Sequence, residues 1–125
     1  MKHRGLVYVV VANKKYAYEQ GKSKIVYIGT TKGGARRIAI SAADKAGKLL
    51  GHHGVTHLEC FVLTTSVETG VPTWQILERG LLIAFRERFG EPPRCNMTGK
   101  GMRWRDELKY FSRKRLDSII EQFSA

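Results

Sequence analysis

The chain has 125 residues, which is enough for one domain with its own core and too few for two ordinary domains. Lysine and arginine number 22 against 11 acidic residues, so the formal net charge is +11 and the pI is about 10.0. This charge predicts a polyanionic partner, although a generically basic surface, as on a ribosome-associated protein, has the same balance, and charge names no activity.

The two cysteines, Cys60 and Cys95, form no C-x-x-C pair, and no secretory signal is evident at the start of the chain. Apolar runs such as 6–12 are far shorter than the ~20 residues that a membrane helix needs. We therefore expect a cytoplasmic protein with reduced thiols and no membrane partner.

Hydrophobic periodicity predicts one domain that mixes strands and helices. We interpret the polar stretch 13–23 as the loop of an antiparallel hairpin, and the Pro92-Pro93 pair predicts an extended segment up to Asn96. In chain order the expected elements are strands at 6–12 and 24–29, a helix at 35–50, a strand at 57–66, a helix at 73–89 between Pro72 and Gly90, and a helix at 103–123.

Two tyrosines occupy the hairpin strands. Because side chains alternate along a strand, Tyr8 lies opposite the valines of its segment, and Tyr27 lies opposite Val26 and Ile28. Both tyrosines are therefore expected to face away from the valine side. Tyrosine is common on half-buried sheet surfaces, so this placement alone indicates no function.

Glu78 is the most diagnostic residue of the helix at 73–89. Steps of ~100° per residue place its carboxylate within the apolar stripe, between Phe85 and Phe89. An unpaired buried charge is costly, so Glu78 should meet a cation, a hydrogen-bonding network or a metal. Helix geometry leaves two interpretations open, a functional carboxylate and a structural ion pair with an arginine such as Arg37.

Arg37 lies on the outward stripe of the helix at 35–50, where an arginine usually faces solvent. The preceding stretch, 29–34, begins like a G-x-x-x-x-G phosphate loop, but Ala35 and Arg36 stand where Lys and Ser or Thr are required. A nucleotide-hydrolase loop is therefore excluded. A glycine-rich turn that enters a helix still offers backbone N–H groups to a phosphate.

His53, His57 and Cys60 have the spacing H-x-x-x-H-x-x-C, which suits part of a zinc site. A fourth ligand is missing nearby. We therefore interpret the histidines as loop residues or as residues facing nucleic acid.

The last helix, at 103–123, is amphipathic, so it is expected to close the core with its apolar side. A second side facing phosphate is compatible with this role. The basic residues of that side are Arg103, Arg105, Lys109, Arg113 and Lys114.

Taken together, these segments resemble the GIY-YIG nuclease domain over residues 6–96, and the chain is interpreted as one such domain over 1–125. The arginine lies ten residues after the second tyrosine, since 37 − 27 is 10, and a helical glutamate, a proline and an asparagine follow in order. The matching residues are Leu6-Val7-Tyr8, Val26-Tyr27-Ile28-Gly29, Arg37, Glu78 and Pro93-Arg94-Cys95-Asn96.

Two positions depart from the family pattern. The first motif reads Leu6-Val7-Tyr8, with its glycine one residue earlier at Gly5. Many members also carry a histidine four residues after the arginine, where this chain has Ser41. The role of that histidine is vacant or falls to another residue, such as His52 or His53.

The resemblance implies a small three-stranded antiparallel sheet flanked by helices, with an additional C-terminal helix. It also implies hydrolysis of a phosphodiester bond, in DNA rather than RNA, with one Mg²⁺ or Mn²⁺ held by Glu78. Tyr8 would be the general base, Tyr27 and Arg37 would hold the scissile phosphate, and Asn96 would brace the site. Residues expected to grip the flanking backbone are Lys24, Lys32 and Arg36, together with Arg103, Arg105, Lys109 and Arg113.

Two other interpretations stay open. One is a binding module that kept the fold and lost cleavage, and the other is a basic ribosomal or RNA-associated structural protein. In the structural protein, Glu78 should pair with an internal arginine. Target selection must come from the domain's own surface, from a homodimer or from a partner chain.

Overall fold

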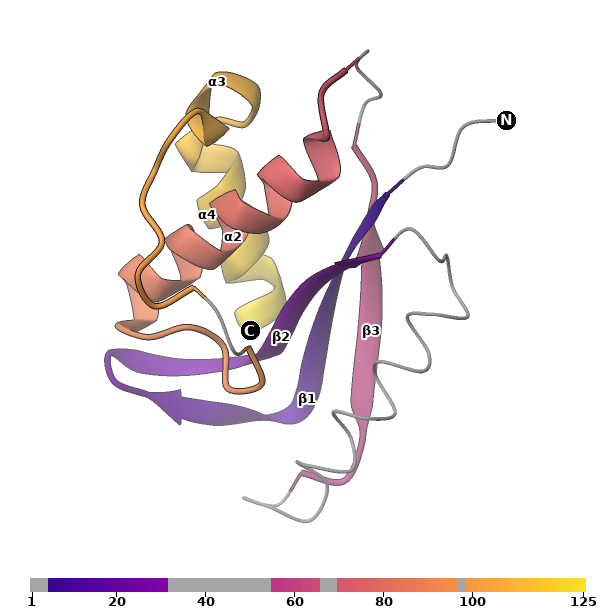
Figure 1. Cartoon of the computed structure of the whole chain (residues 1–125). Helices are drawn as coiled ribbons and strands as arrows, with labels where there is room; N and C mark the ends of the chain where they lie inside the picture. Colours follow the sequence, from indigo (N-terminus) through magenta and orange to yellow (C-terminus); the bar gives the residue numbers. More distant parts are fainter. Residues whose placement is uncertain (1–4, 32–54, 66–69, 97–98) are drawn as a thin grey trace.

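The computed structural model describes residues 5–31, 55–65, 70–96 and 99–125. These residues form a small α+β fold in which a three-stranded antiparallel sheet has the strand order β2-β1-β3. The helices lie together on one side of this sheet (Figure 1). The elements are β1 (Leu6–Tyr18), β2 (Gly21–Thr31), β3 (Leu58–Leu63), α2 (Thr73–Phe89), α3 (Glu107–Tyr110) and α4 (Arg113–Ser124).

The β1–β2 hairpin is longer than expected, and the predicted polar loop over 13–23 is wrong. The two strands pair up to Tyr18 and Gly21, so only two residues form the turn. Gly21 has φ +130°, a conformation that glycine adopts readily. Tyr18 stabilises this end of the hairpin, because its ring packs against Phe85 and Phe89 of α2 while its hydroxyl donates to the Ile25 carbonyl at 2.7 Å. Tertiary packing thus extends strands that the polar sequence alone would end.

A β-bulge interrupts the alternation in β2. Val10 pairs with Tyr27 but Val11 pairs with Ile25, which leaves Val26 as the extra residue. Val26 therefore packs with Tyr8 and Tyr27 on one face, while Ile25 and Ile28 face the helices. The expectation that Val26 opposes Tyr27 is wrong, whereas both tyrosines do face away from the valines that contact the helices.

The core between sheet and helices is apolar. It contains Val7, Val9 and Val11 of β1 together with the apolar residues of α2, and Leu116 and Ile120 of α4. The bounds of α2 confirm the predicted helix. Gly90 ends it in the left-handed region, with φ 84°, and donates its N–H to the Arg86 carbonyl at 2.7 Å.

The predicted continuous helix at 103–123 is wrong, because α3 and α4 are separate. Phe111 is extended, and Ser112 begins α4 as its N-cap by accepting the Arg115 N–H at 3.1 Å. The segment before α3 is held by Glu107, whose carboxylate is 1% exposed and accepts the Arg105 N–H at 2.7 Å and Arg79 Nε at 2.9 Å. Arg103 and Arg105 therefore precede the helix.

The segment after the two prolines is also different from the expectation. Residues 94–95 form a turn, in which Asn96 donates its N–H to the Pro93 carbonyl at 3.0 Å. Cys95 in turn donates its N–H to the Val26 carbonyl at 2.8 Å. This turn therefore carries Asn96 back onto β2, beside Tyr27.

Candidate active site

The candidate site is built around a tyrosine pair on the sheet face opposite the helices. Tyr8 pairs with Gly29 and Tyr27 pairs with Val10, so antiparallel registration brings both rings to one region. Their centroids lie 5.7 Å apart with the planes tilted by 38°. Tyr8 is only 3% exposed, whereas Tyr27 is partly exposed. Tyr27 is therefore the more accessible ring of the pair.

Gly29 makes the close approach of the two rings possible. A Cβ at this position would lie 2.5 Å from Tyr27 Cε2 and 3.0 Å from Tyr8 Cζ. Any side chain would displace at least one ring. The glycine of Tyr27-Ile28-Gly29 thus has a steric role, which sequence reasoning did not assign to it.

The hydroxyl of Tyr27 keeps its proton at neutral pH. Burial raises the pKa of Tyr27 to about 12, with further contributions from the neighbouring Tyr8, through its charge and through a hydrogen bond, and from the charge of Glu78. The hydrogen bond between the two hydroxyls raises the pKa of Tyr27 because it stabilises the protonated phenol.

Glu78, on α2, lies close enough to Tyr27 for its charge to raise the pKa of that phenol. Its side chain is partly buried, and burial raises the pKa of its carboxyl, which the neighbouring Arg79 opposes only in part. Among the described residues Glu78 makes no ion pair, because Arg79 turns to Glu107 and to the Arg103 carbonyl. The ion pair with an internal arginine that a structural role requires is therefore not found in this part of the chain.

Asn96 braces β2 beside the site. Its Oδ1 accepts the Ile28 N–H at 3.0 Å, and its Nδ2 donates to the Ile28 carbonyl at 2.9 Å. The amide thus pairs with Ile28 as a neighbouring strand would, directly between Tyr27 and Gly29. The geometry is that of a positioning residue.

Several predicted site residues lie outside the described part of the chain. These are Lys32, Arg36 and Arg37, with Ser41, His52 and His53. Among the described residues, Tyr8 and Tyr27 lie together. Glu78 acts on Tyr27 through its charge, and Asn96 binds Ile28 beside Tyr27. The approach of Arg37 to this group stays a prediction.

A divalent ion at this site would have Glu78 as its described protein ligand. Within the described ranges no three His, Cys, Asp or Glu side chains gather as a metal cluster, so the zinc spacing gains no support there. Mg²⁺ retains several waters and is commonly bound through one or two carboxylates and a substrate phosphate. A single, partly buried carboxylate that lacks an ion pair within the described residues fits that mode of binding.

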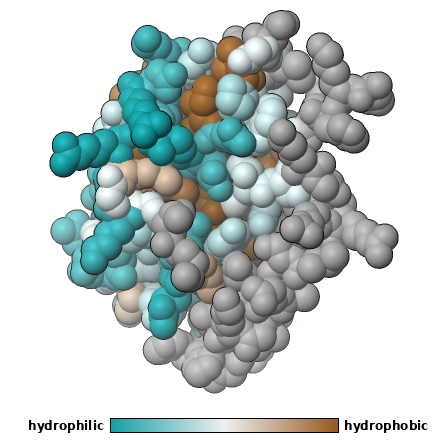
Figure 2. All heavy atoms as spheres, viewed as in Figure 1, coloured by the Kyte–Doolittle hydropathy of each residue, from teal (hydrophilic) through white to brown (hydrophobic). Residues whose placement is uncertain are grey.

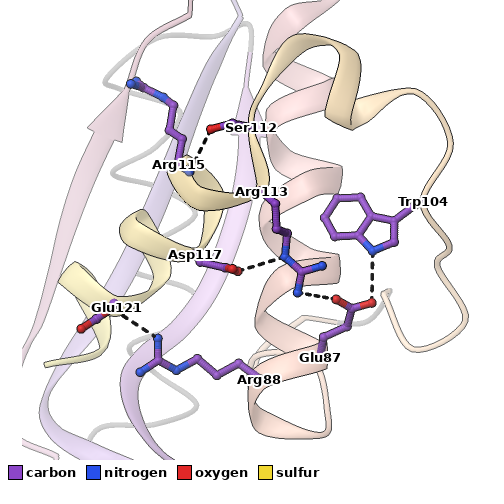
Figure 3. A network of polar contacts seen from close by, with 8 residues as sticks. All are labelled: Glu87, Arg88, Trp104, Ser112, Arg113, Arg115, Asp117 and Glu121. Carbon is purple, nitrogen blue, oxygen red and sulfur yellow. Dashed lines mark hydrogen bonds and ion pairs between the residues drawn. The ribbon is translucent and has the colours of Figure 1, made fainter.

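The basic residues divide into those that form ion pairs within the described part of the chain and those that form none there. Arg113 is engaged, because its guanidinium lies 2.6 Å from Glu87 and 3.2 Å from Asp117 and stacks over the Trp104 ring at 5.1 Å (Figure 3). Trp104 Nε1 also donates to Glu87 at 3.1 Å. These contacts give Arg113 a structural role between α2 and α4.

Among the described residues, the other predicted phosphate contacts form no ion pair. Figure 2 shows hydrophilic side chains over most of the described surface on the side of the helices. Lys24 lies instead at the end of the sheet near Asn13 and His57, away from the tyrosine pair. The exposed basic residues near α3 are Arg103, Arg105 and Lys109.

Comparisons with protein-family models, curated proteins and solved structures give no match for this chain. No helix among the described residues is long and apolar enough to span a membrane.

Proposed function

We propose that the protein is a metal-dependent endonuclease of the GIY-YIG type that hydrolyses phosphodiester bonds, with DNA preferred over RNA. One observation carries the proposal. Two tyrosines are hydrogen-bonded over a glycine, and a partly buried carboxylate lies close enough for its charge to raise the pKa of one of them. A net charge of +11 supports a polyanionic substrate.

The two phenols would have different roles. In the proposed step Tyr8 acts as a phenolate, which takes the proton of the attacking water as the water oxygen bonds to phosphorus and the bond from phosphorus to the leaving oxygen breaks. The Tyr27 hydroxyl, whose pKa is about 12, stays protonated and donates a hydrogen bond to Tyr8 or to a phosphate oxygen. Arg37 would add its charge to the phosphate.

Glu78 would hold Mg²⁺ or Mn²⁺, which supplies charge neutralisation at the leaving oxygen and the phosphate when bound. Asn96 keeps β2 in register beside Tyr27 and takes no part in proton transfer. Gly29 leaves room for the rings. Apart from the metal ion, every group of the proposed site is a residue of this chain.

The proposal is tested by nicking of supercoiled plasmid in Mg²⁺ or Mn²⁺, with EDTA as the metal-free control. We expect Tyr8→Phe and Glu78→Gln to lower the rate by at least about 100-fold, the scale of a lost general base or charge contact. Tyr110→Phe is the matched control, since Tyr110 is an exposed tyrosine on α3. Equal rates for the wild type, Tyr8→Phe and Glu78→Gln would overturn the proposed site.

A binding module without cleavage is the second candidate, and the burial of Tyr8, at 3% exposure, favours it. In that case the wild-type protein binds DNA in a salt-sensitive manner and nicks no plasmid in either metal. Comparison of the two assays on one preparation distinguishes the candidates.

A further inference from the structure

A hollow of about 400 Å³ lies at the β1–β3 end of the sheet, separate from the tyrosine pair. Phe61 pairs opposite Val9, so its side chain lies on the helix side of the sheet, whereas Tyr8 and Tyr27 lie on the other side. The residues around the hollow that matter here are Lys24, His57, Glu59, Phe61, Gln122 and Phe123.

An aromatic platform forms one wall of this hollow. The rings of Phe61 and Phe123 lie 4.9 Å apart, centroid to centroid, and are tilted by 37°. Phe61 is 38% exposed, which leaves part of its ring open to solvent while Phe123 supports it from α4. An aromatic ring held in this way by a second ring is a surface on which a nucleobase can stack.

The polar wall of the hollow is held by Asn13. Its backbone N–H donates to the His57 carbonyl at 3.2 Å, and its Oδ1 accepts the N–H groups of Thr56 at 3.0 Å and His57 at 3.3 Å. The His57 ring is oriented by a contact of 3.1 Å between Nδ1 and Thr56 Oγ1. This segment is therefore fixed before any ligand arrives.

The charges around the hollow suit a nucleotide. Lys24 and His57 supply donors for a phosphate, and Glu59 and Gln122 supply an acceptor and an amide for the edge of a base. Glu59 repels phosphate, so the backbone must lie toward Lys24. The hollow is also within the range of volumes that small ligands occupy.

We propose that this hollow, the Phe61 pocket, binds one unpaired nucleotide of a single-stranded nucleic acid, with the base on Phe61 and the phosphate at Lys24. The proposal rests on the proposed function only in taking nucleic acid as the partner. The Phe61 pocket would distinguish single-stranded from double-stranded nucleic acid, at a place separate from the tyrosine pair.

The test measures binding of two fluorescent oligonucleotides in EDTA, so that no cleavage occurs. One is oligothymidine, and the other is an abasic strand of the same length and charge. We expect the wild-type protein to bind oligothymidine roughly 5- to 150-fold more tightly than the abasic strand, the scale of base stacking on one aromatic residue.

Phe61→Leu retains apolar contact with Phe123 and should abolish this preference, whereas Phe61→Trp should retain it. Leu108→Ala is the control, since Leu108 is a 48% exposed apolar residue on α3. Equal affinity of the wild type for both strands, or an unchanged preference in Phe61→Leu, would overturn the Phe61 pocket.

The outcome is independent of the nuclease assay. A preference for oligothymidine without plasmid nicking would retain the pocket and reject the nuclease. Plasmid nicking without a preference for oligothymidine would retain the nuclease and reject the pocket.

Discussion

Gly29 decides the local geometry at the scale of single residues. It lies under two aromatic rings that leave no room for a methyl group. At Gly29 a side chain is excluded, whereas at Glu78 the protein retains a carboxyl group that is costly to ionise in the folded state. A carboxylate whose burial raises its pKa stores unfavourable free energy in the folded state, and function is one reason for a protein to retain it.

Gly29→Ala should displace the tyrosine rings, lower the free energy of unfolding by about 1–3 kcal/mol, and reduce plasmid nicking by more than 10-fold. Chemical denaturation and the nicking assay measure the two effects. Gly101→Ala is the matched control, because a Cβ there has no neighbour within 4 Å. Wild-type nicking by Gly29→Ala would show that the close ring contact is unimportant.

Glu78→Gln should make the metal-free protein more stable at pH 7, by roughly 0.5 kcal/mol for a partly exposed group. The sign follows from the raised pKa of the Glu78 carboxyl. The free-energy cost of ionising the Glu78 carboxyl in the folded protein is absent below the pKa of the unfolded state, about 4.3. It grows as the pH rises from that value toward the higher pKa of the folded state.

Thermal unfolding of the wild type and Glu78→Gln from pH 3 to pH 8 checks this expectation. The difference in Tm should vanish at the acidic end. Added Mg²⁺ should raise the Tm of the wild type more than that of the variant, because a ligand stabilises the state that binds it. A lower Tm for Glu78→Gln at pH 7 would mean that Glu78 has a stabilising partner.

At the scale of elements, local sequence signals decide α2, while tertiary contacts decide the hairpin and the C-terminal helices. Helix α2 has a long apolar pattern and a glycine at its end, so its bounds could be predicted. The hairpin strands continue through polar residues because Tyr18 docks on α2. The periodicity of 103–123 conceals a break, because Phe111 is extended and Ser112 caps a new helix.

Ser112→Ala removes the hydroxyl that caps α4, so we expect a loss of about 1 kcal/mol in the free energy of unfolding. Urea denaturation measures it. Ser118→Ala is the control, because Ser118 is exposed within the same helix and has no capping position. An equal effect of the two substitutions would argue against the break between α3 and α4.

At the scale of the whole molecule, a basic side chain can bind phosphate only if it is not already paired with a carboxylate of the protein. Arg113 is held by two carboxylates and a tryptophan ring, whereas Lys109 on α3 forms no ion pair within the described residues. A count of basic residues along 103–123 treats the two alike. The tertiary contacts separate them.

The salt dependence of duplex DNA binding should therefore distinguish Lys109 from Arg113. Lys109→Ala should reduce the slope of log K against log salt concentration by about 1, the loss of one phosphate contact. Arg113→Ala should leave the slope unchanged while lowering stability. A reduced slope for Arg113→Ala would show that its ion pairs open on DNA.

The sequence by itself determined the α+β class, the antiparallel hairpin, the bounds of α2 and the shared face of Tyr8 and Tyr27, because these follow from periodicity and local caps. It also placed Glu78 among apolar neighbours. Only the tertiary structure decided the bulge at Val26, the docking of Asn96 on Ile28 and the engagement of Arg113. Each of these joins residues far apart in the chain, and contacts between such residues leave no local pattern.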